Sequence, residues 1–534
     1  MDTATRSLEA RMDTHFATLT REKAVQRLWQ RDGTLYSADP AVAKAVRNRL
    51  GWLFCLQVMR DHIERLTVLA RVVERQGYDR VLVLGMGGSS LWPEVIGRHL
   101  RGRRGLPVRI ADSTHPHAVA EALAWCKTGK PLFVVATKSG GTVETLSLYR
   151  ALRLQFNDGQ HFVAITDPGS GLETLAKAEH FREIFLNPAD IGGRFSAGSL
   201  FGLVPAVLAG AVLTDALQRM GDMLDACREE DPTLNPGANL GALLAAASES
   251  GRWQMRLSLG KDVRGFAAWI EQLVGESTGK HGKGVLPVPG GVEGTGDALA
   301  AKLEHALVVS LTTFVHPDDD FTARATEAGV PVTQEVMPEA ADLWTEVIRW
   351  EFATAIAGWL LQINPFDEPD VGAAKAATGA LLDGSRQPAE PDRRVSIAQL
   401  AELGPALRPE LEAQSADDYL AVLCYLPPTM QNQQRLEALR ESLQRQTAAA
   451  VTVQFGPRYL HSTGQFHKGG LARGLFVVVH DFASLDASDD IAVPGSPFGF
   501  LALAQAQAAG DVAVLKERGK PVIVAELARS EPKS

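Results

Sequence analysis

Two short loops carry residues suited to binding an anion. The stretch ATKSGGTVET, residues 136–145, contains two glycines, a lysine, a glutamate and four side-chain hydroxyls. The stretch GMGGSS, residues 85–90, has three glycines followed by two serines. Glycines let a ligand approach the backbone closely, and hydroxyls and helix N-terminal amides favour a phosphate. Both loops therefore predict phosphate binding, although tight helix entries capped by serine or threonine would have the same composition.

The first of these loops also raises the possibility of a dinucleotide site. A G-x-G-x-x-G pattern is met at Gly85 and Gly87, but Ser90 occupies the third glycine position. Asp112 lies near the end of the next apolar run, where an acid that binds a ribose would stand. The glycine pattern is weak evidence, and from the residues alone the dinucleotide alternative stays open.

Three further motifs place a charged residue close to glycines. GESTGKHGKG, residues 275–284, holds Glu276, which suits a general base or only a capping residue. It is not a nucleotide-binding P-loop, since neither Gly-Lys pair is followed by Ser or Thr. In IGGRFSAGS, residues 191–199, Arg194 suits stabilisation of an anion or a surface salt bridge. NPFDEPDVGAAK ends at Lys375 and, taken alone, is typical of a solvated helix N-terminus.

The surrounding pattern predicts the elements that would position these motifs. The first eighty residues have apolar residues at helical spacing. Short apolar runs then alternate with turn residues and helical stretches, at residues 81–85, 108–112, 132–137, 162–166 and 183–187. This alternation is the signature of a parallel α/β sheet with both faces covered. Ligands of such sheets bind at the carboxyl ends of the strands, where the strand order reverses.

The remainder of the chain predicts two more units. An apolar run at 306–315 and a long helical stretch at 343–363 belong to the second, and the polar segment 383–394 predicts a linker. Apolar runs at 419–426, 450–455, 474–482 and 521–527 predict a third α/β segment. The expected divisions are a helical lead-in at 1–75, first and second domains at 76–235 and 236–382, and a C-terminal α/β segment at 395–534.

Composition restricts the class of protein. The 534 residues are 45% apolar and 22% charged, with a net charge of −9 that argues against a nucleic-acid partner. No apolar run is long enough for a membrane span, and the N-terminus lacks the apolar stretch of a signal peptide. Four dispersed cysteines predict reduced core thiols, and no metal-ligand cluster is expected. The histidines at 115 and 117 are expected in a surface loop.

Taken in order, the motifs closely resemble those of the phosphoglucose isomerase family over about residues 80–380. Residues 275–288 and 455–470 are most similar to the isomerase half of bacterial transaldolase–phosphoglucose isomerase fusions. The resemblance implies two sugar-isomerase (SIS) type three-layer αβα domains with parallel sheets. It also implies a cytoplasmic homodimer that interconverts glucose 6-phosphate and fructose 6-phosphate in glycolysis and gluconeogenesis, through an enediol and without a cofactor, a metal, a nucleic acid or a membrane.

The resemblance also implies a role for individual residues. Glu276 would be the base that moves a proton between C2 and C1, Arg194 would stabilise the enediolate, and Lys375 would assist ring opening. The residues expected to hold the phosphate and line the sugar are Thr137, Lys138, Ser139, Thr142, Thr145, Gly88, Ser89, Gly193 and Glu368.

Two departures from the family pattern stand out. The family's ring-opening histidine, in a Gly-x-x-x-Gln-His setting after the base motif, is absent, and His305 falls too late, before an apolar run. We expect His461 or His467, in the polar segment 459–470, to replace it. Glu368 stands where many relatives carry glutamine. Alternatives are an isomerase that also accepts mannose 6-phosphate, or a non-catalytic phosphosugar sensor, which would have no need of Glu276.

Overall fold

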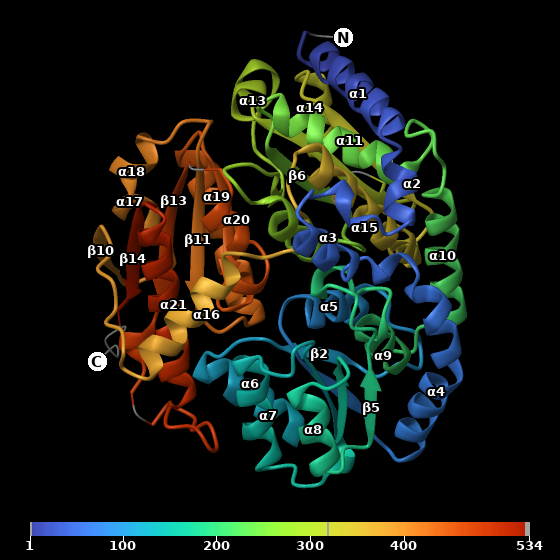
Figure 1. The fold of residues 1–534 in the computed structure, drawn as a ribbon. Coiled ribbons are helices and arrows are strands. Elements are labelled where there is room, and N and C mark those ends of the chain that lie inside the picture. The colour runs from blue at the N-terminus through green and yellow to red at the C-terminus, as the bar shows by residue number, and fades with distance from the viewer. Residues whose placement is uncertain (1–2, 318–319, 472, 487, 529–534) are drawn as a thin grey trace.

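Three parallel sheets form the framework of the molecule (Figure 1). The computed structural model describes residues 3–317, 320–471, 473–486 and 488–528. The first sheet contains β1 (Arg80–Leu84), β2 (Val108–Ala111), β3 (Pro131–Ala136), β4 (Phe162–Thr166) and β5 (Glu183–Leu186) in the order β2-β1-β3-β4-β5. In register, Val83 pairs with Ile110 on one side and Val134 on the other. The order reverses between β1 and β3, so the loops after these two strands are neighbours.

Helices cover both faces of the first sheet. They are α5 (Leu91–His99), α6 (Pro116–Lys127), α7 (Val143–Arg153), α8 (Gly171–Ala178) and α9 (Leu200–Leu208). Helix α10 (Leu213–Ala226) follows them in the chain but packs on α15 (Leu343–Leu360) of the second unit. The N-terminal helices α1 (Thr3–Arg21), α2 (Ala24–Trp29), α3 (Pro40–Arg47) and α4 (Cys55–Arg75) run along the outside of the first two units (Figure 1). Helix α4 packs on α9 and α10, whereas α1 packs on the second unit.

The second sheet has four strands in the order β7-β6-β8-β9. They are β6 (Gln254–Leu259), β7 (Leu286–Pro289), β8 (Ala306–Thr313) and β9 (Val332–Met337). The helices of this unit are α11 (Pro236–Glu249), α12 (Phe266–Ile270), α13 (Gly296–Lys302), α14 (Asp320–Glu327) and α15 (Leu343–Leu360), with a π-helical turn, η6 (Glu271–Glu276), continuing α12. Helix α16 (Val371–Leu382) leaves this unit and packs on the third.

The third unit is a complete five-stranded parallel sheet in the order β10-β14-β13-β11-β12. Its strands are β10 (Arg393–Ile397), β11 (Tyr419–Tyr425), β12 (Ala450–Phe455), β13 (Gly474–His480) and β14 (Val522–Leu527). Its helices are α17 (Leu403–Ala406), α18 (Arg408–Glu412), α19 (Met430–Gln446), α20 (Gly464–Gly469) and α21 (Phe500–Glu517). The predicted linker 383–394 was too long by two residues, because β10 begins at Arg393 and pairs with β14.

Single-turn 3₁₀ segments join many of these elements. They are η1 (Gly33–Leu35), η2 (Gly51–Leu53), η3 (Gly87–Ser89), η4 (Gly159–His161), η5 (Gly193–Phe195), η7 (Ala340–Asp342), η8 (Leu400–Glu402), η9 (Arg458–His461) and η10 (Phe482–Ser484). Three of them, η3, η5 and η9, lie in contact with one another or with the π-helical turn η6. The expected parallel α/β architecture is therefore confirmed, with irregular turns gathered at one place.

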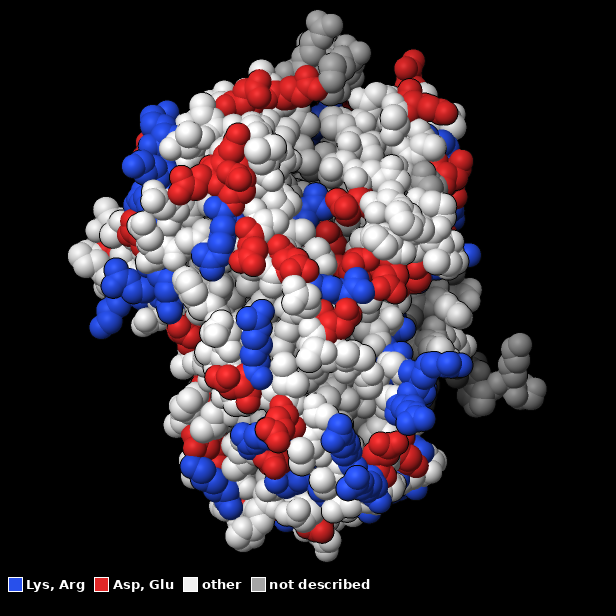
Figure 2. Space-filling model, turned by 90° about the vertical axis from the view of Figure 1, so that its right-hand side faces the viewer, with Lys and Arg blue, Asp and Glu red and all other residues white. Residues whose placement is uncertain are grey.

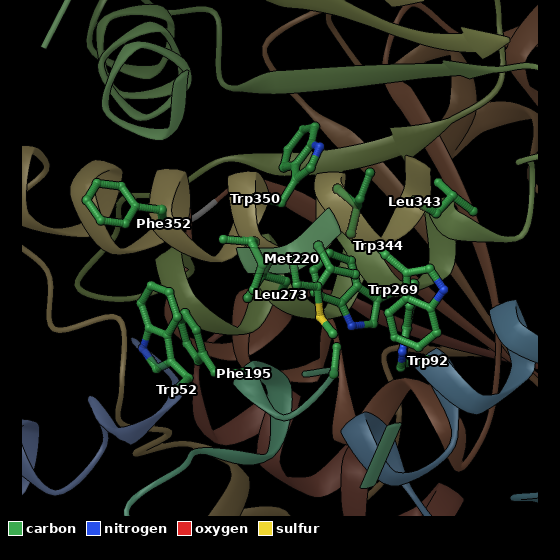
Figure 3. Packing of buried hydrophobic residues seen from close by; sticks show 14 of the residues in the cluster. Trp52, Trp92, Phe195, Met220, Trp269, Leu273, Leu343, Trp344, Trp350 and Phe352 are labelled. Carbon is green, nitrogen blue, oxygen red and sulfur yellow. The ribbon is translucent and has the colours of Figure 1, made fainter. Parts of the chain in front are cut away.

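One aromatic cluster joins the first two units (Figure 3). Trp92 of α5 contacts Trp269 of α12 and Trp344 of α15, with ring centroids 5.9 and 4.9 Å apart. Trp52 stacks on Phe195, the residue after Arg194, at 5.5 Å. All five side chains are buried. Because aromatic rings bury large apolar areas, this cluster fixes η5 and η6 relative to one another.

The surface and the cysteines agree with the composition. Basic and acidic side chains lie interspersed on the face seen in Figure 2. All four cysteines are free and buried, as expected. Within the described residues, no helix combines the length and the apolar character needed to cross a membrane.

The histidine pair was wrongly predicted to be a surface loop. His115 is 2% exposed, and its Nε2 lies 2.9 Å from Asp481 Oδ1 of the third unit. His117 is half-exposed and faces Asp489 of the same unit. The pair therefore belongs to the contact between the first and third units, which the sequence could not reveal.

A buried glutamate is a costly feature of the core. Glu351, on α15, is 1% exposed, and its Oε1 has no hydrogen-bond partner among the described residues. Burial raises the pKa of its carboxyl group well above the usual value, although the amide of Ala197 donates to it. The folded protein therefore favours the neutral acid, whereas the unfolded chain ionises near pH 4.5.

We expect Glu351→Gln to stabilise the protein at neutral pH. With a raised folded pKa, stability is lost as the pH rises above the unfolded pKa, because the unfolded chain releases its proton first. Glutamine removes this loss, so thermal unfolding temperatures of variant and wild type should be similar near pH 4 and diverge towards pH 7.5. The exposed Glu64 provides the control variant Glu64→Gln. A variant that melts below wild type at pH 7.5 would contradict this account.

Candidate active site

The site lies where the order of the first sheet reverses. The glycine loop after β1 forms η3, and the loop after β3 leads into α7. A Cβ atom on Gly88 would stand 1.9 Å from the carbonyl oxygen of Gly193, so only glycine lets η3 and η5 approach so closely. A Cβ atom on Gly87, which has φ of +56°, would stand 2.8 Å from the carbonyl oxygen of His461. The glycines of this loop thus bring three chain segments together, and Ser89 lies at the end of the same turn.

The hydroxyls of the loop after β3 converge at the start of α7. Thr137 Oγ1 and Thr142 Oγ1 are 2.8 Å apart. Thr145 is fully buried, and its Oγ1 has no hydrogen-bond partner among the described residues. Ser139 is exposed, and its Oγ accepts a hydrogen bond from the amide of Gly141. Hydroxyls gathered beside a helix N-terminus form a suitable cradle for a phosphate.

Lys138 faces away from this cradle. Its ammonium group pairs with Asp167, and it also donates to the carbonyl oxygen of Ala189 at 2.8 Å. The lysine therefore ties the loop after β3 to the segments after β4 and β5. The structure gives it a role in holding the loop, which the sequence did not predict.

Arg194 is buried at the centre of the site. It is 5% exposed and extends from η5 towards the second unit. Its Nε donates to Ser277 Oγ at 2.8 Å, and its Nη2 donates to the carbonyl oxygens of Pro365 and Asp367. Its Nη1 lies 3.2 Å from Glu276 Oε1. The surface salt bridge considered for Arg194 is excluded by this burial.

The surroundings of Arg194 favour its charged form. Burial disfavours the cation, but the attraction of Glu276 and then Glu368 raises the pKa of the guanidinium above its usual value. Glu368 Oε2 lies 3.2 Å from Arg194 Nη1, with 40% of its side chain exposed. The carboxylate that departs from the family pattern therefore competes with Glu276 for the same nitrogen.

Glu276 closes the π-helical turn that follows α12. The residue is 8% exposed, and Gln272 Nε2 donates to its Oε2 at 3.2 Å. Burial raises the pKa of Glu276; the nearby Arg194 opposes this effect, and the repulsion of Glu368 adds to it. A carboxyl group with a raised pKa beside a fixed cation is suited to general-base chemistry. π-Helical turns are frequent at functional sites, and here the turn directs Glu276 towards Arg194.

Lys280 fastens the segment that carries Glu368. Its Nζ donates to the carbonyl oxygen of Asn364 at 2.6 Å and lies 2.8 Å from Asp367 Oδ1. Burial, followed by the repulsion of Arg194, lowers the pKa of Lys280 to about 8. The GESTGK and NPFDE motifs, separated by 84 positions, are joined by this lysine.

The third unit contributes a histidine to the site. His461 ends η9, and its Nε2 lies 2.9 Å from Glu144 Oε1 of α7. Gln272 Nε2, which donates to Glu276, also donates to the carbonyl oxygen of His461 at 2.9 Å. Gln507 of α21 donates to the same Glu144 oxygen at 2.8 Å. The base, the phosphate loop and His461 are therefore linked by a continuous network.

His467 lies elsewhere. It is fully buried, its Nε2 is 3.0 Å from Gln454 Oε1, and its ring stacks on Tyr419 within the third unit. Burial, followed by the repulsion of Lys468, lowers its pKa well below the usual value. Lys468 itself pairs with the buried Asp511 at 2.6 Å. Of the two candidate histidines, the structure brings only His461 to Glu276.

Lys375 occupies an exposed position on the first turns of α16. It lies near enough to Glu144 for its charge to help lower the pKa of that carboxyl group, although burial opposes this and His461 has the larger effect. Lys375 is thus at the rim of the site, whereas Arg194 and Glu276 are at its floor.

The dinucleotide alternative is not supported by the placement of Asp112. This carboxylate is 4% exposed and pairs with Arg458 of the third unit, its Oδ2 being 2.7 Å from Arg458 Nε. Ser90, at the third glycine position, donates to the carbonyl oxygen of Gly87. A ribose has no free acid to bind at this position.

Three residues of the site, Glu144, Gln272 and Ser277, were not predicted from the sequence. Glu144 lies in the first turn of α7, between Val143 and Thr145, and nothing in the local sequence indicates which residue it contacts. Gln272 lies four positions before Glu276, one helical turn away on the same face. Only the second of these signals could have been found without the fold. Among the described residues, no group of three or more His, Cys, Asp and Glu side chains could hold a metal ion.

The fold and the site together define a class of protein: doubly wound α/β proteins with a hydroxyl-rich anion loop facing a buried arginine–glutamate pair, as expected of sugar phosphate isomerases. The family model described as phosphoglucose isomerase matches residues 10–285, which is more than half of the chain. The chain belongs to the phosphoglucose isomerase family.

Individual relatives agree with this assignment. The chain is 30% identical over 258 residues to the glucose-6-phosphate isomerase of Carboxydothermus hydrogenoformans, covering 45% of this chain and 55% of that protein. It is 25% identical over 401 residues to the Leptospira interrogans enzyme of the same name, covering 62% and 86%. The solved glucose-6-phosphate isomerase of Chlamydia trachomatis has the same fold, with a TM-score of 0.54, 19% identity and coverage of 73% and 88%.

We expect Glu368→Gln to move the acidic limb of the pH–rate profile to lower pH. Removing the carboxylate removes a repulsion that raises the pKa of Glu276, and leaves Arg194 Nη1 to Glu276 alone. The base then stays ionised at lower pH. The measurement is kcat/KM for sugar phosphate isomerisation from pH 5 to 9, with the exposed Glu390→Gln as control. An acidic limb at the same pH as in the wild type would show that Glu368 does not raise the pKa of Glu276.

Proposed function

We propose that the chain interconverts glucose 6-phosphate and fructose 6-phosphate through an enediol. The observation that carries the proposal is the buried pair of Arg194 and Glu276, which is connected through Gln272 to His461 and lies beside the hydroxyl-rich loop. A phosphosugar sensor would need the loop, but it would have no use for a buried base with a raised pKa. The geometry therefore favours an enzyme.

Glu276 is the base of the proposed reaction. Its carboxylate takes the proton from C2 of the open-chain aldose, and the same group returns that proton to C1 of the enediol to give the ketose. Negative charge develops on the oxygens at C1 and C2 in between, and the hydroxyl proton at C2 passes to the oxygen at C1. Arg194 is fixed by four hydrogen bonds to Ser277, Glu368, Pro365 and Asp367, so it stabilises that charge without reorganising.

His461 is the proposed base of ring opening. Its Nε2 lies 2.9 Å from Glu144 Oε1, which leaves Nδ1 as the ring nitrogen that accepts a proton. It would take the proton from the anomeric hydroxyl while a proton is supplied to the ring oxygen, and Lys375 at the rim is the proposed donor. The phosphate would be held by Thr137, Ser139, Thr142 and Thr145, with Gly88, Ser89 and Gly193 lining the sugar.

Two substitutions should separate the two chemical steps. Glu276→Gln removes the base, and we expect isomerisation to fall by at least about 10²-fold. Exchange between the α and β anomers of glucose 6-phosphate should continue, because His461 is intact. In His461→Ala, by contrast, we expect enzyme-catalysed exchange between the anomers to be lost.

Both rates can be followed in one sample by exchange NMR of glucose 6-phosphate, with fructose 6-phosphate formation as the second signal. His117→Ala, a change at a half-exposed histidine, is the control. Anomer exchange at the wild-type rate in His461→Ala would reject its role. Mannose 6-phosphate is assayed in parallel, since the acidic Glu368 departs from the family pattern at the sugar site.

The proposal extends to assembly and location. We propose a homodimer acting in the cytoplasm, as family membership implies. Both Glu276 and His461 belong to one chain, so the histidine does not have to come from a second subunit. We therefore expect activity per chain to stay constant when the protein is diluted through its dimer dissociation, measured by light scattering. Activity that falls in step with dissociation would show that the partner completes the site.

A further inference from the structure

A large cleft lies outside the catalytic site, where the three units meet. Its volume is about 1430 Å³, and it is lined by β2 and α5 of the first unit, the loops after β6 and β7 of the second, and α19 of the third. Arg194, Glu276 and the hydroxyls of the phosphate loop do not line it. Small-molecule sites have volumes of roughly 300–1,000 Å³, so the cleft has room for a metabolite.

Two buried arginines lie side by side at the wall formed by α19. Arg440 is 6% exposed and lines the cleft, and its Nη1 has no hydrogen-bond partner among the described residues. Arg256, on β6, is fully buried; among the described residues it donates only to the neutral side chains of Gln444 and Gln254, and its Nε has no partner there. Gln444 follows Arg440 by one helical turn, so Arg256 contacts α19 on the same face that carries Arg440.

The positive charge at this wall is not balanced. Arg440 pairs with Glu437, whose side chain is 58% exposed, and no carboxylate pairs with Arg256 in the part of the chain that the structure describes. Burial, followed by the repulsion of Arg440, lowers the pKa of Arg256 to about 9, so Arg256 remains charged at neutral pH. Buried cations without a full complement of acids are costly unless an anion joins them.

The backbone beside the arginines is shaped for close approach. Gly290, with φ of +87°, follows β7, and a Cβ atom there would stand 2.7 Å from Arg440 Nη2. Gly291 lines the cleft beside it. A side chain at Gly290 would displace the guanidinium, so the glycine keeps Arg440 at the wall of the cleft.

We infer that this wall of the cleft is a second site for a phosphoryl group, distinct from the catalytic loop, in which Arg440 binds the anion directly and Arg256 supports its charge from behind. The planar guanidinium matches a phosphate oxygen pair in a fork geometry. The ligand class is inorganic phosphate or a small phosphate ester, and the volume of the cleft leaves room for the organic part of an ester.

The test is calorimetric titration with inorganic phosphate and, separately, with glycerol 3-phosphate. The protein carries Thr137→Val and Thr142→Val, which remove two of the four hydroxyls proposed to hold the catalytic phosphate, so the result depends neither on turnover nor on the proposed isomerase function. We expect this protein to keep one binding site. Adding Arg440→Gln should weaken that site by at least about tenfold, whereas Arg435→Gln, an exposed arginine of the same helix, should leave it unchanged.

The two ligands distinguish the source of the phosphoryl group. Tighter binding of glycerol 3-phosphate supports a metabolite ester, and equal binding supports the free ion. Arg440→Lys is the control for a folding defect, because it keeps the positive charge and loses only the paired N–H donors of the guanidinium. We expect this variant to bind with intermediate affinity and to have an unchanged melting temperature. No binding to the double-valine protein, or the same affinity in Arg440→Gln, would overturn the inference.

Discussion

Everything at the site depends on keeping Arg194 charged while it is buried. Removing a guanidinium from water is costly, and only a nearly complete shell of acceptors offsets that cost. The shell comes from two segments of the chain: one provides Glu276 and Ser277, and the other provides the carbonyl oxygens of Pro365 and Asp367 and the carboxylate of Glu368. The tryptophan cluster beneath η5 and η6 and the lysine bridge of Lys280 hold these acceptors at fixed distances from the guanidinium. The fold of the first two units can be understood as the support for this one cation.

The third unit adds a second pair of side chains, His461 and Glu144, to that arrangement. Its sheet is complete in itself, yet η9 places His461 between the phosphate loop and the base, where His461 contacts Glu144. Gln507 of α21 donates to the same Glu144 carboxylate. The ion pairs of Arg458 with Glu94 and Asp112 fasten η9 to the first unit. Because these pairs are partly or fully buried, they fix the direction from which the histidine approaches.

The sequence predicted what depends on local patterns. The fully apolar strands β1, β3, β4 and β8, and the loops after β1 and β3, follow from runs of buried residues and from glycine chemistry. The half-exposed strands β9 and β10 and the proline-bearing β7 were not identified, since they lack a continuous apolar run. The choice between the two histidines depends on their contacts: His461 contacts Glu144, hundreds of positions away, and His467 contacts Gln454, thirteen positions away. No local sequence pattern predicts such contacts. The ion pair between Asp112 and Arg458 could not be predicted for the same reason.

The position of His461 along the chain has a consequence for biosynthesis. The arginine, the base and the phosphate loop are all encoded before residue 280, and His461 follows Glu276 by 185 residues. At ribosomal speeds of about 5–20 residues per second, roughly 10–40 s separate the emergence of the two groups. During that interval a nascent chain can fold its first two units and bind a phosphate, but it has no imidazole opposite Glu144. Given the role proposed for His461, a nascent chain is catalytically inactive until the third sheet has been synthesised and has folded.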